Sequence, residues 1–168
     1  MSSLYDTDVH AWANEQVKRL RAGKLAAADV AHIAEELETL GRTEKRELLG
    51  RLTILLTHLS RWVHQPGLRG RSWQLTIEVQ RRDVLDHLAD NPSLKAQLDD
   101  VLERAYARAW LEAARETGLG RDTFPDTCPW PFERIVADDS WPESTATVFF
   151  HRIAWSMRRE PSYRMDHS

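Results

Sequence analysis

The chain has 168 residues, a length that suits one domain or one domain with a tail. Hydrophobic residues make up 42% and charged residues 29%, enough to form an ordinary core under a solvated surface. The single cysteine, Cys128, excludes an internal disulfide, and no apolar run approaches the ~20 residues that cross a bilayer. The N-terminus lacks the basic and apolar regions of a signal peptide, so we expect a cytoplasmic protein without a membrane span.

Helical signals begin near the N-terminus. Asp6 or Thr7 can cap a first helix, and Gly23 is expected to end it. A second helix is predicted to begin near residues 27–29, because apolar side chains then recur at the 3.6-residue period. We expect this second helix to stop at Gly41.

Thr43 is the predicted N-cap of a third helix. Its leucine-rich stripe is wide, which suits a central helix packed on more than one neighbour. Pro66 and Gly67 end it, since the residue before a proline avoids the α region. The helix lies within a basic stretch, residues 42–82, which holds nine Lys or Arg against three Asp or Glu and is flanked by acidic segments.

Two more helices follow. Ser72 is the predicted N-cap of a fourth helix over residues 73–88. Asn91 followed by a proline is a typical helix start, because proline suits the first helical position. It predicts a fifth helix over residues 92–117 that Gly118 closes.

The remaining chain has a different texture. Residues 119–143 contain four prolines and four aromatic side chains, so we expect an ordered loop that packs its aromatic groups on the bundle, with a short helix near 131–137. A further helix is predicted over 144–158. The sequence therefore predicts an all-α helical bundle of about five main helices with an aromatic, Pro-rich loop and a further C-terminal helix. We place the bundle domain at 4–142 and the C-terminal helix and tail at 143–168.

The chain contains a series of short motifs, each of which occurs once, in this order: Leu4-Tyr5-Asp6-x-Asp8 with Trp12, Glu35-Glu36-Leu37-Glu38, Leu55-Leu56-x-His58-Leu59-x-Arg61-Trp62, Ser72-Trp73-x-x-Thr76-Ile77-x-x-Gln80-Arg81, Glu116-Thr117-Gly118-Leu119, Phe124-Pro125-x-x-Cys128-Pro129-Trp130 and Trp141-Pro142. With these motifs the chain resembles a bacterial family known as domain of unknown function 29, over residues 4–142. The resemblance implies an α-helical bundle from a bacterium. It implies no activity, catalytic residue or cofactor.

The first candidate site lies where the third helix meets the fourth. Two glycines in residues 67–72 can take positive φ and form an anion nest that leads into a helix N-terminus. Arg69 and Arg71 add two forked donors beside Ser72, and Arg61 can reach the same end. The pattern predicts a site for a phosphate-bearing ligand or nucleic acid. The simpler interpretation is an interhelix turn whose arginines pair with the acidic segments, since the Lys-Ser/Thr ending of a phosphate-binding loop is absent.

A second candidate consists of polar side chains on otherwise apolar faces. The short loop between the third and fourth helices predicts antiparallel packing, which brings His58 near Gln80. A buried Arg81 needs a charged partner, and Glu35 or Glu36 is the expected one. His58 is then a candidate acid or base. The simpler interpretation is a satisfied polar network that fixes the register of the helices.

A metal site is the third candidate. His32 precedes Glu35 and Glu36 by three and four residues, so one helical face presents an imidazole and carboxylates. Di-metal bundles use Glu-x-x-His pairs from two helices, whereas this order is reversed and occurs once. His58 would complete the set from the next helix.

No catalytic pattern outweighs its structural alternative, so the sequence favours an interaction or regulatory module without catalysis and without a cofactor. The C-terminal helix carries Phe149, Ile153 and Trp155 together with Arg152, Arg158 and Arg159, so it can contact another protein or a second copy. The simpler interpretation is a helix that packs back on its own bundle. Two alternatives stay open. One is binding of a phosphate ligand or nucleic acid at the junction of the third and fourth helices, although a pI near 6.2 disfavours nucleic acid. The other is a metal-dependent or His-based hydrolytic enzyme.

Overall fold

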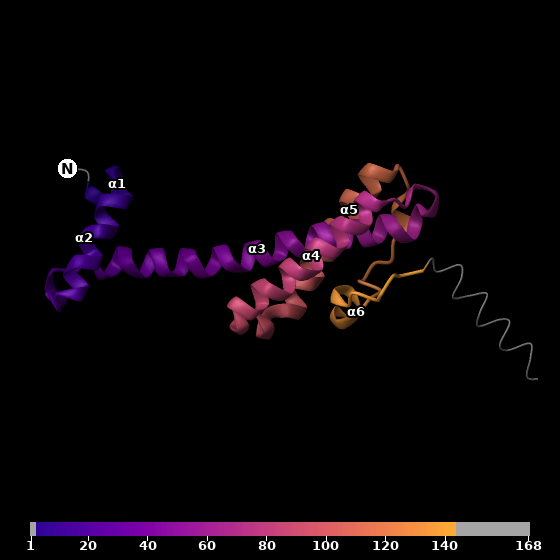
Figure 1. The fold of residues 1–168 in the computed structure, drawn as a ribbon. Coiled ribbons are helices and arrows are strands. Elements are labelled where there is room, and N and C mark those ends of the chain that lie inside the picture. The colour runs from indigo at the N-terminus through magenta and orange to yellow at the C-terminus, as the bar shows by residue number, and fades with distance from the viewer. Residues whose placement is uncertain (1–2, 144–168) are drawn as a thin grey trace, which may run out of the picture. The chain divides into compact units, whose positions relative to one another are not determined.

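A computed structural model describes residues 3–143, and within that range the chain forms helices and no strand (Figure 1). This confirms the predicted all-α class. The chain divides into two compact units, unit 1 (Met1–Glu47) and unit 2 (Leu48–Ser168), and one long helix, α3 (Val30–His64), runs from the first into the second. The predicted C-terminal helix over 144–158 lies outside the described residues. None of the described helices has the length and apolar character needed to cross a membrane.

Unit 1 begins with two short capped helices, α1 (Leu4–Thr7) and α2 (Val9–Arg21), before the 3-10 helix η1 (Leu25–Ala27). Ser3 and Asp6 form a capping box, so the first helix starts earlier than Asp6. Asp8 then interrupts it, because its carboxylate accepts a hydrogen bond from the backbone N–H of Ala11 and caps α2. Gly23 ends the segment at φ +69°, as predicted.

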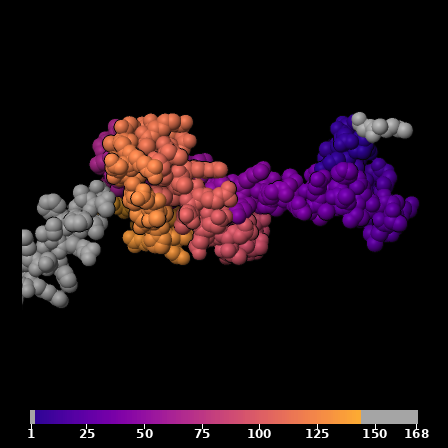
Figure 2. All heavy atoms as spheres, turned by 180° about the vertical axis from the view of Figure 1, so that it is seen from behind, coloured from indigo at the N-terminus to yellow at the C-terminus, as the bar shows by residue number. Residues whose placement is uncertain are grey.

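The predicted second and third helices are one helix, α3, so the stop at Gly41 and the cap at Thr43 are wrong. Gly41 is not among the glycines with positive φ, so it does not form the left-handed cap that commonly ends a helix. The Thr43 hydroxyl donates to the carbonyl oxygen of Thr39 inside the helix rather than capping a new one. Every residue of α3 from Leu37 to Thr43 is exposed, and Figure 2 shows this purple stretch uncovered on the face it presents.

Unit 2 contains the second half of α3, η2 (Pro66–Leu68), α4 (Arg71–Asp90), η3 (Pro92–Gln97), α5 (Leu98–Thr117), η4 (Arg121–Thr123) and α6 (Phe132–Val136). Helix α6 confirms the short helix that was predicted near 131–137. The N-cap of α4 is Gly70, so Ser72 lies inside the first turn and does not cap. The first six residues of the predicted fifth helix form η3, and the Asn91 amide donates to the carbonyl of His87 instead of capping.

Two contacts establish how α3 and α4 pack in unit 2. Arg51 forms an ion pair with Asp83 at 2.7 Å, and the guanidinium of Arg61 lies 4.1 Å from the centre of the Trp73 ring. Positions later in α3 therefore meet positions earlier in α4, and the two helices are antiparallel as expected. The Thr57 hydroxyl reaches the Ala109 carbonyl at 3.5 Å, so α5 packs on α3 as well.

The core of unit 2 is a leucine-rich cluster in which α3 is the central helix. Side chains from α3, α4, η3, α5 and α6 meet there, including Leu48, Leu52, Leu55, Leu56, Ile77, Val84, Leu94, Val101, Ala105 and Ile135. The aromatic loop packs against this cluster through the partly buried Trp130, Phe132 and Trp141, and Phe124 is buried. This is the arrangement that the Pro-rich, aromatic composition of 119–143 predicted.

Candidate functional site

The predicted anion nest does not form. Gly67 lies in η2 and Gly70 has φ −143°, and positive φ occurs within residues 3–143 only at Gly23 and Gly118. A nest needs successive N–H groups turned the same way, which a 3-10 turn followed by an extended residue does not provide. Residues 66–70 therefore form an interhelix turn without an anion nest.

Two of the arginines near this turn are held by other residues. The Nε of Arg69 donates to the carbonyl oxygen of Trp62 at 2.7 Å, and its guanidinium lies 5.1 Å from the Trp62 ring centre. Arg61 pairs with Glu116 of α5 at 2.5 Å and lies over Trp73. These contacts tie the end of α3 to its neighbours.

Arg71 and Ser72 are exposed in the first turn of α4, where they line an open groove with Leu75, Thr76, Val79 and Gln80. The groove follows one face of a single helix. The prediction that a phosphate-bearing ligand or nucleic acid binds at this junction now depends on Arg71, Ser72 and the N–H groups of the α4 N-terminus. It stays a prediction.

Arg81 is fully buried, and its partners are not the expected carboxylates of Glu35 or Glu36. Its Nε donates to the carbonyl of Ile135 at 2.9 Å, one terminal nitrogen to that of Asp138 at 3.3 Å, and the other to that of Ser140. Burial lowers the pKa of the guanidinium, and the three carbonyl acceptors offset part of the cost of its desolvation. Arg81 thus holds the segment after α6 in place.

No hydrogen bond joins His58 to Gln80 within residues 3–143. With Arg51 opposite Asp83 and Arg61 near Trp73, the antiparallel register places His58 opposite Thr76, about one helical turn from Gln80. The Nδ1 of His58 contacts the carbonyl oxygen of Ile54 at 2.9 Å in its own helix. A hydrolytic role for His58 stays a prediction without a partner residue to support it.

The proposed metal ligands His32, Glu35, Glu36 and His58 all lie on α3, rather than on two helices as the prediction required. His58 comes about six turns after Glu36 in the same helix, so one metal ion cannot join them. His32 and Glu36 have other partners within unit 1. The Nδ1 of His32 lies 2.7 Å from Asp29 Oδ2, and the Tyr5 hydroxyl donates to Glu36 Oε1 at 2.7 Å.

These contacts belong to a polar and aromatic cluster that joins α1 and α2 to α3. The Trp12 indole N–H donates to Asp29 at 3.2 Å, and the Tyr5 ring stacks on His32 with centroids 4.0 Å apart. The hydrogen bond to Asp29 raises the pKa of His32, and that to Glu36 raises the pKa of Tyr5 to about 12. The first two sequence motifs, around Tyr5 and around Glu36, therefore have a structural role in unit 1.

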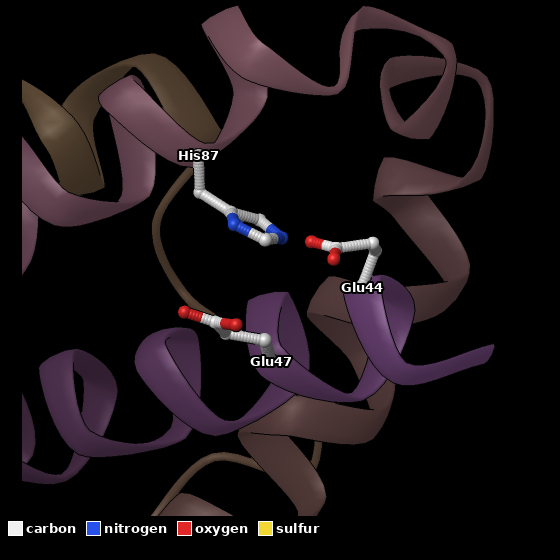
Figure 3. A group of neighbouring side chains, drawn as sticks. All are labelled: Glu44, Glu47 and His87. Atoms are coloured by element: carbon white, nitrogen blue, oxygen red, sulfur yellow. The ribbon is translucent and has the colours of Figure 1, made fainter. Parts of the chain in front are cut away.

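Figure 3 draws three further side chains with metal-binding chemistry, Glu44 and Glu47 of α3 and His87 of α4. The two carboxylates are three residues apart on one helix, and His87 is buried. Glu44 and Glu47 belong to unit 1 and His87 to unit 2, so they form no part of the sites within either unit.

Sequence reasoning missed a cavity of about 470 Å³ in unit 2, which we call the aromatic pocket. Its wall combines the end of α3, one residue of α5, the aromatic loop and α6: Ser60, Val63, His64, Tyr106, Pro125, Pro129, Trp130, Arg134, Ser140, Trp141, Pro142 and Glu143. These residues come from five separate stretches of sequence. The sequence feature that could have indicated this pocket is the density of tryptophan and proline between Phe124 and Pro142.

Cys128 lies in this loop, and its thiol is half-buried. Its Sγ donates to the carbonyl oxygen of Trp130 at 3.4 Å, and burial raises the pKa of the thiol. A raised pKa keeps the sulfur protonated at neutral pH, which argues against a nucleophile. The geometry supports a structural role for this cysteine.

Comparison with known proteins adds the family. No curated protein and no solved structure matches this chain. The model of the family described as "Domain of unknown function DUF29" matches residues 4–141, nearly the range over which the sequence motifs were found. With most of its length matched, the chain belongs to the DUF29 family.

Proposed function

We propose that this protein is an interaction module without catalysis, and that it pairs with a second copy of itself through the first part of α3. The observation that carries the proposal is an apolar stripe exposed on that helix. Val30, Leu37 and Leu40 are 67%, 63% and 57% exposed, and Ile33 is half-buried between them. They occupy a and d positions of two successive heptads, the spacing at which helices pair.

The first part of α3 has no packing partner over residues 37–43 in the described chain. All seven residues from Leu37 to Thr43 are exposed, so nothing in the described chain packs on this part of the helix. A short helix surrounded by water is only marginally stable on its own, and most helices are stabilised by burying an apolar face. A partner that covers Leu37 and Leu40 would supply that burial.

A second copy fits the stripe for reasons of shape and charge. Ala34 and Gly41 flank the leucines at the e positions of the heptads, and their small size lets a neighbouring helix approach closely. Residues 35–38 hold three glutamates and residues 42–46 hold three basic residues. In an antiparallel pair, Glu35 of one copy lies at the level of Arg42 of the other, whereas a parallel pair places like charges together. A two-fold axis near residues 38–39 sets Leu37 of one copy against Leu40 of the other.

Multi-angle light scattering after size exclusion tests the pairing. The wild-type protein is expected to elute as a dimer and Leu40→Glu as a monomer. Each leucine contributes roughly 1.5–3 kcal/mol when buried, and symmetry doubles the effect, so the substitution should weaken association by about 100-fold or more. A glutamate at this exposed position leaves the fold intact.

Leu111→Glu is the matched control, because Leu111 is 54% exposed on α5 in unit 2 and lies off the stripe. It should leave the dimer unchanged. A wild-type protein that stays monomeric at its highest soluble concentration would overturn the proposal. So would a Leu40→Glu protein that dimerises as well as the wild type.

A further inference from the structure

The aromatic pocket has walls that are fixed before any ligand arrives. The Tyr106 hydroxyl donates to the Pro125 carbonyl at 2.9 Å, which holds the start of the loop against α5. Arg81 holds the other wall through the carbonyls of Ile135 to Ser140, and the Trp141 ring packs 4.6 Å from that of Trp62. Ligand sites are mostly pre-formed cavities of a few hundred cubic ångströms, so this volume suits a small molecule.

The charges of the wall are balanced and sparse. Among the twelve lining residues, Arg134 is the single basic side chain and Glu143 the single acidic one, and neither forms an ion pair within residues 3–143. His64 adds no charge at neutral pH, because burial lowers the pKa of its imidazole, whose ring packs against Phe124. The rest of the wall is mostly tryptophan, tyrosine, valine and proline.

From this balance we propose that the aromatic pocket binds a small zwitterion of the α-amino acid class with an aromatic or large apolar side chain. Arg134 receives the carboxylate, Glu143 receives the ammonium group, and Trp130 and Trp141 contact the side chain. A guanidinium matches a carboxylate through two parallel hydrogen bonds. A polyanion such as a nucleotide would meet the repulsion of Glu143 with only one basic group to attract it.

Isothermal titration of the full chain with L-phenylalanine tests the assignment against two analogues. 3-Phenylpropionate lacks the ammonium group, and 2-phenylethylamine lacks the carboxylate. We expect phenylalanine to bind, and each analogue to bind at least about tenfold more weakly, which is the usual loss when one hydrogen bond to a charged group disappears.

Two variants assign each charge to its residue. Arg134→Gln should weaken phenylalanine binding by about tenfold and abolish the preference for phenylalanine over 2-phenylethylamine. Glu143→Gln should abolish the preference over 3-phenylpropionate. Arg108→Gln, at an exposed residue of α5 away from the pocket wall, is the control and should change neither.

The proposal is overturned if phenylalanine does not bind at millimolar concentration, or if both analogues bind as tightly as phenylalanine. It is equally overturned if Arg134→Gln and Glu143→Gln keep the wild-type preferences. Far-ultraviolet circular dichroism confirms that each variant is folded. The pocket lies within unit 2, so these outcomes are independent of pairing through α3.

Discussion

Arg81 organises the wall of unit 2 from a fully buried position. Its helical spacing predicted burial, but the expected partner was wrong. Periodicity assigns a residue to a helical face, and it does not reveal which backbone carbonyls, more than fifty residues later, will meet that face. A guanidinium carries five donors, and three carbonyls satisfy it here without a carboxylate.

Arg81→Met should destabilise unit 2 by about 3 kcal/mol. The substitution keeps much of the aliphatic volume but leaves the three carbonyls that accepted hydrogen bonds buried without a donor. Urea denaturation followed by tryptophan fluorescence measures the loss. The exposed neighbour gives a control, Arg82→Met, which should cost less than about 0.5 kcal/mol. Equal losses for the two variants would contradict the role of Arg81.

The pKa of His32 should lie above that of an ordinary histidine, and the pKa of His64 should lie below it. The hydrogen bond to Asp29 raises the pKa of His32, whereas burial lowers that of His64. The stability from His32 is fully present below its unfolded pKa of about 6.5 and is lost as pH rises through the folded value. His64 acts in the reverse direction, because stability is lost as pH falls below about 6.5 toward its folded pKa. Imidazole proton chemical shifts across pH 4–9 check both, and a His64 pKa above that of His32 would refute this account.

At the scale of elements, the sequence predicted where helices exist better than where they stop. Gly23 and Gly118 end helices at φ +69° and +70° as expected, whereas Gly41 sits inside α3. The local signals at Gly41 and Thr43 resemble those of a genuine break. A glycine inside a helix destabilises the helix by only about 1 kcal/mol relative to alanine, so the helix can continue through it. Sequence alone therefore could not distinguish the two kinds of glycine.

Two glycine substitutions should shift stability in opposite directions. Gly50 lies inside α3 with no atom within 4 Å of an added Cβ, so Gly50→Ala should stabilise unit 2 by about 1 kcal/mol. Gly118 closes α5 at φ +70°, where a Cβ is strained, so Gly118→Ala should destabilise it by about 1 kcal/mol. Urea midpoints at equal slope measure both changes. Shifts of the same sign would contradict the backbone assignment.

At the scale of the whole molecule, composition and periodicity were enough to predict the all-α class and the ordered aromatic loop. They did not predict the division into two units, because the boundary falls inside a continuous helix. Nor did they predict the aromatic pocket, whose lining residues come from α3, α5, α6 and the loop. Such a site depends on which segments, distant in the sequence, pack together, and a local sequence pattern does not predict this packing.

The exposed stripe on α3 is a second feature whose partner the sequence does not reveal. The period of Val30, Ile33, Leu37 and Leu40 is that of a packed helix, and it does not say whether the packing partner is in the same chain. In the structure three of these four side chains are exposed. The contact predicted for the C-terminal helix lies outside the described residues and stays a prediction beside the pairing proposed for α3.

Cysteine cross-linking tests this pairing most directly, because the chain has only one native cysteine to remove. In a Cys128→Ser background, Leu40→Cys lies near the proposed two-fold axis and should give a covalent dimer with a short bismaleimide. Val30→Cys lies far from the axis in an antiparallel pair and should stay monomeric under the same conditions. Failure of Leu40→Cys to cross-link, or equal cross-linking of Val30→Cys, would contradict the antiparallel pairing.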